Sequence, residues 1–247
     1  MAIRTLLVAE LASNHSGQWN ICEDMIKSAA DHGADWVKLQ LYDASVLHKD
    51  DPQKAWLTEC QVSRPVLERM IKVAERSGVK ITASVFGIGE AMLASACGLK
   101  TIKIGSGDSA REDLASFCEG AFHTVWKSYG LSGPRPEDRS IPFYGVSQYP
   151  TPYLRGLARL KQSDKSGVWG WSDHGENLEV AKEAMLEGAT YLERHYSLGV
   201  GRGCRWSAWD TSYDQLKELR LFAEDCSWEG SKAHGEAVAQ YIGRWGA

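Results

Sequence analysis

The sequence predicts a (β/α)₈ barrel, also called a TIM barrel, built as a single domain over residues 1–247. Short apolar segments alternate with amphipathic helical segments along the whole chain, which is typical of βαβ units and a parallel sheet. Eight such apolar segments are present, and polar residues collect at their C-terminal ends, where barrels of this kind carry their active sites. The chain is also long enough to bury a substantial core without disulfides.

The expected strands and helices follow in regular alternation. The strands are expected at 5–11, 36–42, 80–86, 101–105, 124–128, 142–146, 167–171 and 190–196. Apolar periodicity predicts helices at 20–32, 64–77, 88–98, 109–119, 152–162, 176–187 and 212–225. Several of these helices end at or near a glycine, such as Gly33 and Gly98, which is a common C-terminal signal.

One helix is missing from this pattern, between the fifth and sixth strands. The segment 129–142, YGLSGPRPEDRSIP, contains three prolines and two glycines and has no apolar periodicity. We therefore expect the fifth helix to be reduced to a loop. Part of the barrel wall would then be exposed or covered by a partner subunit, so a homodimer is expected.

Composition excludes several classes of protein. The formal net charge of -4 argues against a nucleic-acid partner. No segment approaches membrane-spanning length and the N-terminus has no signal-peptide pattern, so we expect a cytoplasmic protein without a membrane partner. The six cysteines show no CxxC spacing, which predicts neither a zinc knuckle nor a disulfide framework.

Polar side chains lie at the C-terminal ends of the expected strands. They are Glu10, Lys38, Gln40, Ser84, Lys103, Ser106, Asp108, Ser128, Ser147, Tyr149, Ser172, Asp173, His174, Glu193 and His195. Random placement would scatter charges over the outer face and the bottom of the barrel as well. The set therefore indicates an active site at the barrel mouth.

Two lysines, Lys38 and Lys103, lie within otherwise apolar strands. Burying an ammonium group without a partner costs several kcal/mol, so an anion is expected between them. The segment KIGSGD (103–108) adds backbone N–H groups and a hydroxyl that suit phosphate or carboxylate. The alternative for either lysine alone is an ion pair with Glu10 or Glu193; the two together favour the anion site.

Two histidines follow neighbouring strands and could converge on one metal ion. His174 follows the seventh strand and His195 ends the eighth. A lone histidine at a strand end is more often a hydrogen-bonded core residue than a ligand. With Glu10, Asp173 and Glu193 expected nearby as oxygen donors, however, two imidazoles suit Mn²⁺, Fe²⁺ or Zn²⁺.

Six motifs carry a resemblance to a known family. They are AELASNHSG (9–17), GADWVKLQ (33–40), IKIGSGD (102–108), SQYPTPY (147–153), WSDHG (171–175) and LERHYSL (192–198). In this order they resemble the motifs of the sialic acid synthase family, whose members condense phosphoenolpyruvate with an aldehyde sugar.

The resemblance implies a metal-dependent barrel with a phosphoenolpyruvate site. By similarity, His174 and His195 would bind the metal, most often Mn²⁺, with Mg²⁺, Fe²⁺, Co²⁺ and Zn²⁺ as alternatives. The phosphate and carboxylate of phosphoenolpyruvate would meet Lys38, Ser84, Lys103, Ser106, Ser128, Ser147 and Ser172, with Gln40 nearby. The implied catalytic residues are Glu10, Asp108, Tyr149 and Glu193, and Glu193 is our candidate for handling the attacking water.

The sequence departs from this family pattern in the acceptor region. Family members usually carry a Gly-Pro-Asp turn after the ERH motif, whereas this chain reads GRGC (201–204). Arg202 and Gly203 then occupy the Pro and Asp places, so we expect an acceptor other than N-acetylmannosamine. The family's C-terminal antifreeze-like domain is expected to be absent, and Arg202 or Arg205 would contact the acceptor instead.

Three functions are consistent with these residues. The leading one is a transferase that joins phosphoenolpyruvate to an aldehyde and yields a 2-keto acid and phosphate. The first alternative is a non-catalytic barrel that binds phosphoenolpyruvate or a related anion as a sensor or accessory subunit. The second is a metallohydrolase with a site of two histidines and a carboxylate, which would need no lysine pair and no acceptor.

Overall fold

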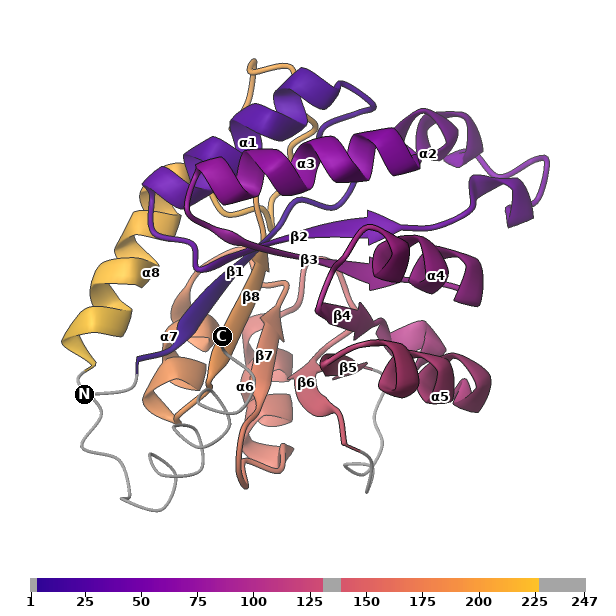
Figure 1. Cartoon of the computed structure of the whole chain (residues 1–247). Helices are drawn as coiled ribbons and strands as arrows, with labels where there is room; N and C mark the ends of the chain where they lie inside the picture. The colour runs from indigo at the N-terminus through magenta and orange to yellow at the C-terminus, as the bar shows by residue number, and fades with distance from the viewer. Residues whose placement is uncertain (1–3, 131–138, 227–247) are drawn as a thin grey trace.

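Eight parallel strands close into a barrel in strict chain order, as the sequence predicts (Figure 1). The computed structural model describes residues 4–130 and 139–226. The strands are β1 (Leu6–Glu10), β2 (Trp36–Leu41), β3 (Lys80–Val85), β4 (Thr101–Ile104), β5 (Thr124–Tyr129), β6 (Ile141–Gly145), β7 (Gly170–Asp173) and β8 (Tyr191–His195). Glu10 at the end of β1 pairs in register with Lys38 on β2 and with His195 on β8, which closes the barrel.

The helices pack on the outside of this barrel (Figure 1). They are α1 (Trp19–Asp31), α2 (Lys54–Cys60), α3 (Arg64–Arg76), α4 (Ile88–Ala96), α5 (Glu112–Ala121), α6 (Tyr153–Gln162), α7 (Glu179–Leu186) and α8 (Tyr213–Asp225). All seven expected helices are present, and α2 is an addition. In the described part of the chain, no helix is long and apolar enough to cross a membrane.

The seventh strand is shorter than the sequence predicts, and the connection after β5 is described only at its two ends. The seventh strand begins at Gly170 rather than at residue 167, because Gly167 takes a positive φ of 73° that interrupts the extended backbone. Between β5 and β6, residues 130 and 139–140 are not helical. The expected loop is centred on residues 131–138, which lie outside the described residues.

Alternate residues of each strand face the barrel interior, and the lower interior is filled by large side chains. Val8, Trp126, Ile141, Phe143 and Tyr191 form a buried cluster there. The ring centroids of Trp126 lie 4.8 Å from Phe143 and 4.9 Å from Tyr191. This aromatic plug fills the lower interior, so among the described residues the space for a ligand inside the barrel lies above it.

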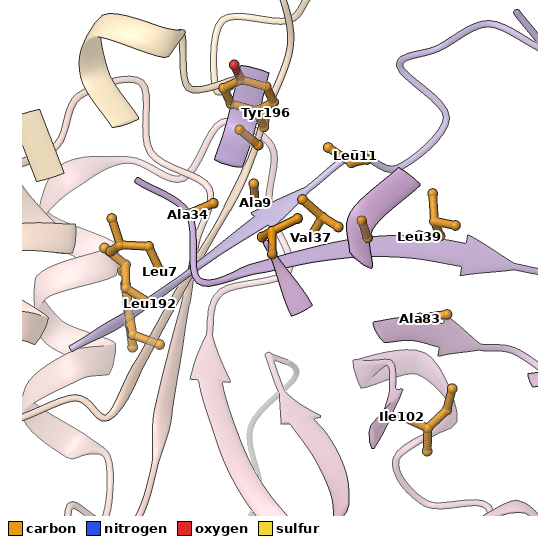
Figure 2. Packing of buried hydrophobic residues seen from close by; sticks show 14 of the residues in the cluster. Leu7, Ala9, Leu11, Ala34, Val37, Leu39, Ala83, Ile102, Leu192 and Tyr196 are labelled. Carbon is orange, nitrogen blue, oxygen red and sulfur yellow. The ribbon is translucent and has the colours of Figure 1, made fainter. Parts of the chain in front are cut away.

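The other face of each strand packs against the helices. Figure 2 shows Leu7 of β1 beside Leu192 of β8, and Ala9 and Leu11 near Val37 and Leu39 of β2, all members of one apolar cluster. These side chains are almost completely buried, with 2% exposure or less. Burial of this outer layer fixes which residues of each strand must point inward.

Asp35 joins three segments at the lower end of the barrel. Its carboxylate accepts hydrogen bonds from Arg4 (2.7 and 2.9 Å), from the Leu7 amide (2.8 Å) and from Arg220 of α8 (3.1 Å). Burial alone would raise the pKa of Asp35, but the hydrogen bonds from Arg4 and Leu7 hold it below its usual value. The charged carboxylate therefore stabilises the folded state.

We predict that Asp35→Asn lowers the free energy of unfolding by about 1–3 kcal/mol at neutral pH, because it weakens bonds to two guanidinium groups. A carboxyl whose pKa is lowered by folding contributes stability above its unfolded pKa of about 3.9 and loses it as the pH falls through the folded pKa. Urea unfolding should therefore show the difference shrinking below about pH 4. Asp50→Asn, at a side chain that is 73% exposed, is the control; equal effects of the two changes would contradict the prediction.

Candidate active site

A cavity of about 230 Å³ opens at the C-terminal ends of the strands, above the aromatic plug. Its lining includes Glu10, Lys38, Gln40, Ser84, Lys103, Ser106, Asp108, Ser128, Ser147, Tyr149, Ser172, His174, Glu193 and His195. We call it the inner cavity. The structure thus brings together all of the predicted strand-end residues except Asp173, and Arg202 is exposed and also lies outside this lining.

Two lysines and two glutamates form a charged layer at the floor of the inner cavity. Lys103 Nζ donates to Glu193 Oε1 at 2.7 Å and to Ser172 Oγ at 2.8 Å. Lys38 forms an ion pair with Glu10, lies 3.6 Å from Glu193 Oε2 and donates to Ser84 Oγ at 2.7 Å. Each of the four charged side chains is at most 7% exposed. We call these four residues the ion layer.

The ion layer contains the ion pairs that were the alternative expectation for the lysines. Both ammonium groups are paired with carboxylates, so the ion-pair alternative describes the protein as it stands. Their burial alone does not require a bound anion, because two positive charges balance two negative ones. An anion site at this position remains a prediction.

Burial and pairing shift the pKa values of the ion layer in different directions. Burial lowers the pKa of Lys103 to about 8. Burial would raise the pKa of Glu193, but the ammonium groups of Lys103 and Lys38 hold it below its usual value. Burial also raises the pKa of Glu10, against the opposing effect of Lys38. Glu193 is therefore the more firmly ionised of the two carboxylates.

Five serines line the inner cavity, and Gly130 lies against two of them, Ser106 and Ser147. Its N–H donates to Ser106 Oγ at 3.0 Å, and its carbonyl accepts from the Ser147 amide at 3.2 Å. A Cβ at Gly130 would lie 2.3 Å from Ser147 Oγ and 2.8 Å from Ser106 Oγ, so a side chain there would displace both hydroxyls. Sequence analysis missed Gly130, although a glycine directly after the fifth strand was an available signal.

Asp108 lies at the rim of the inner cavity. It ends the short 3₁₀ helix η2 (Ser106–Asp108), and the longer helix expected from residue 109 begins at Glu112 instead. Its carboxylate is paired with Arg111 at 3.4 Å, an arginine that sequence analysis did not single out. The Asp108 side chain is 22% exposed, so it is more accessible to solvent than the carboxylates of the ion layer.

The two histidines lie side by side at the mouth, with ring centroids 5.7 Å apart. His174 Nδ1 lies 2.9 Å from the Val146 carbonyl oxygen, which can only accept, so Nδ1 carries the proton and Nε2 keeps its lone pair. Burial lowers the pKa of His174 to about 4 and that of His195 well below its usual value. Both rings are therefore neutral at pH 7, the form that binds a metal ion.

These residues fit a divalent ion that takes two ligands from the protein. Within residues 4–130 and 139–226, no group of three or more His, Cys, Asp and Glu side chains is arranged to hold a metal. Oxygen atoms of substrate or water would then supply the remaining ligands of the ion beside His174 and His195. An ion bound in this way would keep open positions, as catalytic metal sites do.

Asp173, expected beside the histidines as an oxygen donor, is not part of the cavity lining. That expectation is wrong, because adjacent residues of a strand point to opposite faces and Ser172 faces the cavity. Asp173 instead forms an ion pair with Arg194, and both side chains are at most 3% exposed.

A larger cavity of about 980 Å³ continues outward from the mouth and shares Gln40, Phe86, Tyr149 and His195 with the inner cavity. We call it the outer cavity. Aromatic rings of Tyr42, Trp56 and Trp209 line it, and Trp56 belongs to α2, the helix that sequence analysis missed.

Of the two arginines considered for the acceptor, only Arg205 lines the outer cavity. Its guanidinium lies 4.2 Å from the centre of the Trp56 ring, a cation–π distance. Its amide donates to the Asn14 carbonyl oxygen at 2.6 Å, which fixes the loop to the segment after β1. Arg202 lines neither cavity.

The fold and the position of the charged cavity define a TIM barrel with a polar site at the C-terminal ends of its strands. Solved structures agree on the fold. The N-acetylneuraminic acid (sialic acid) synthetase of Leptospira borgpetersenii superposes with a TM-score of 0.80 at 19% identity, over 97% of this chain and 92% of that one. A truncated 3-deoxy-D-arabino-heptulosonate 7-phosphate synthase of Thermotoga maritima gives 0.65 at 11% identity, over 97% and 88%.

A sequence profile described as the NeuB family matches residues 25–221, and the chain belongs to this family. It is 23% identical to the N,N'-diacetyllegionaminic acid synthase of Campylobacter jejuni over 229 residues, covering 79% of this chain and 68% of that protein. It is 22% identical to a pseudaminic acid synthase of the same species, covering 87% and 72%. The resemblance drawn from the six motifs is confirmed.

We predict that Lys103→Met lowers the free energy of unfolding by about 3 kcal/mol, because it leaves an unbalanced negative charge in the buried ion layer. Adding Glu193→Gln should recover a large part of this loss, since it restores the charge balance. Urea unfolding of the single and double variants measures both effects, with Lys100→Met, at an exposed position, as the control. A double variant less stable than either single variant would contradict the charge-balance account.

Proposed function

We propose that this chain condenses phosphoenolpyruvate with an aldehyde acceptor to give a 2-keto acid and phosphate. The observation that carries the proposal is the inner cavity, where two lysines and five serines surround a small space beside Glu193 and two neutral histidines. Family membership supports it, since two relatives are named as synthases of sugar acids. At about 230 Å³, the cavity is below the range of about 300–1,000 Å³ usual for drug-sized ligands, so it suits a small anion.

The lysines have hydrogen-bonding capacity left for such an anion. An ammonium group has three N–H donors, and Lys103 uses two of them on Ser172 and Glu193. The third would meet a phosphate or carboxylate oxygen of phosphoenolpyruvate. Further donors would come from Lys38, from the Gln40 amide and from the hydroxyls of Ser84, Ser106, Ser128, Ser147 and Ser172, as the family resemblance implies.

Glu193 is the best-placed group to handle the attacking water. Its Oε2 atom is buried and accepts no hydrogen bond in the described part of the chain, although it lies 3.6 Å from Lys38 Nζ. A water that donates to this oxygen would lie beside any anion held by the lysines. Because its pKa is held low, Glu193 would orient the water first and take its proton only as positive charge develops at C2.

The bond changes follow from this arrangement. C3 of phosphoenolpyruvate forms a bond to the aldehyde carbon, and the aldehyde oxygen takes a proton to become a hydroxyl. C2 becomes electron-poor and accepts the water oxygen, while the two water protons leave through Glu193. One of them balances the proton taken up by the aldehyde oxygen, and the other leaves with the phosphate. The bond between C2 and the bridging oxygen then breaks, so phosphate leaves to the lysines and C2 becomes the keto carbon.

The mouth of the barrel would hold the acceptor. A Mn²⁺ ion on His174 and His195 would, when bound, act as a Lewis acid toward the aldehyde oxygen. Tyr149 lies between this mouth and the outer cavity, with its ring centroid 4.2 Å from His174 and 5.7 Å from Trp209. Burial raises its pKa to about 12, so its hydroxyl stays protonated and can donate to the acceptor.

We also propose that the acceptor is not N-acetylmannosamine, because GRGC replaces the usual turn, and that Arg205 contacts its outer end. Arg202 as an acceptor contact, the single domain over residues 1–247 and the homodimer stay predictions. Sedimentation at micromolar concentration would check the dimer, and a monomer alone would remove it.

We predict phosphate release from phosphoenolpyruvate with Mn²⁺ only when a suitable aldehyde is present. The panel should include N-acetylmannosamine, free and phosphorylated pentoses and hexoses, and nucleoside-derived or aromatic aldehydes. Lys103→Met should reduce the rate by at least about 100-fold, the effect expected for loss of a charge stabiliser, whereas Lys100→Met should leave it unchanged.

The alternatives would give different results in the same assay. Phosphoenolpyruvate binding without turnover over the whole panel would favour the sensor. Phosphate release without any acceptor would favour the metallohydrolase. Full activity of Lys103→Met would refute the assigned role of the lysine.

We predict that His174→Ala and His195→Ala each weaken Mn²⁺ binding at least about tenfold in the absence of substrates, because each change removes a ligand. Electron paramagnetic resonance of free Mn²⁺ measures this affinity directly. His48→Ala, whose side chain is 75% exposed, is the matched control. Unchanged binding by both site variants would place the metal elsewhere.

A further inference from the structure

Arg194 lies between Glu193 and His195 in sequence but on the opposite face of β8 from the inner cavity. Its guanidinium forms the ion pair with Asp173 and donates to four further oxygens. These are the Gly175 carbonyl (2.8 Å), the Asn177 carbonyl (3.1 Å), the Trp209 carbonyl (3.5 Å) and Thr211 Oγ1 (2.8 Å). One buried side chain thus binds five groups from two segments of the chain, residues 173–177 and 209–211.

The groups that Arg194 holds belong to the segments that carry the two histidines. Asp173 and Gly175 are the neighbours of His174 on either side. On the other side, the Thr211 amide donates to the His195 carbonyl at 2.7 Å. Movement of Arg194 would therefore shift the backbone on both sides of the metal-binding pair.

A purely structural ion pair does not explain this arrangement. Pairing with Asp173 alone would need only a positive charge, which a lysine would supply. The planar guanidinium instead directs its donors along fixed directions to several acceptors at once. Buried ion pairs are also weak contributors to stability, because burying the charges costs as much as the pairing returns.

We propose that Arg194 is a positioning residue that sets the separation of the two imidazoles and thereby the affinity for the divalent ion. This inference rests on the metal-binding part of the proposed function. Substitution of residues that orient metal ligands typically lowers metal affinity about 10–100-fold, because the ligands are no longer held in place before the ion binds.

The test is Mn²⁺ affinity without substrates, by electron paramagnetic resonance, for Arg194→Lys. We expect affinity to fall about 10–100-fold and turnover to recover at saturating Mn²⁺. Arg220→Lys is the matched control, since Arg220 is also largely buried (15% exposed) and pairs with Asp35 far from the mouth. This control should lower thermal stability but change Mn²⁺ affinity by no more than about twofold. That is less than the loss of about 10–100-fold typical when a residue that orients a metal ligand is replaced.

Thr211→Val provides a second variant that keeps the charge of the ion pair. It removes only the hydroxyl that accepts from Arg194, and we expect a smaller fall in affinity in the same direction. Wild-type affinity in both Arg194→Lys and Thr211→Val would overturn the inference and leave the proposed function intact. No Mn²⁺ binding by the wild-type protein would overturn both the inference and the metal part of the proposed function.

Discussion

The ion layer of Lys38, Glu10, Lys103 and Glu193 is the interaction on which the candidate site depends. Four charges buried in a barrel are expensive, and apolar side chains of similar volume would often serve stability as well or better. The aromatic plug directly below shows that this barrel can be filled with apolar groups. The charges are therefore better explained by chemistry performed above them than by the needs of the fold.

The ion layer also gives each neighbouring group its place. The two lysines draw Ser84 and Ser172 toward the cavity, and their pairing keeps Glu193 ionised with one oxygen left for a water. The neutral histidines lie nearer the barrel mouth than the ion layer, where the inner cavity opens into the outer cavity. This order separates a small charged compartment from a larger aromatic one, which matches a reaction between a small anion and a bulkier acceptor.

Much of this could be predicted from the sequence, because the barrel and its strand ends depend on local patterns. Alternating apolar segments predicted the strands, and their polar ends predicted nearly the whole inner cavity. The same period of two could have corrected Asp173 and revealed Arg194: since Ser172 and Glu193 face inward, their neighbours face outward. Neither was recognised, because strand-end position alone was taken as the signal.

The residues that sequence analysis missed depend on contacts between segments distant in the chain. Gly130 matters only because Ser106 and Ser147 close around it, and Arg205 only because α2 brings Trp56 beneath it. The helix α2 lies in the long connection between β2 and α3, and only its last residue is buried. Its sequence therefore has little of the apolar periodicity from which a helix can be predicted. Local patterns hold no information about such pairings.

In the proposed reaction, water adds at C2 of phosphoenolpyruvate beside Glu193, so that the bond from C2 to the bridging oxygen breaks. Turnover of phosphoenolpyruvate labelled with ¹⁸O at that bridging oxygen tests it most directly. The label is predicted to leave with the phosphate, as mass spectrometry of the released phosphate would show. Unlabelled phosphate, with the label kept in the organic product, would mean that water attacks phosphorus and would contradict the account.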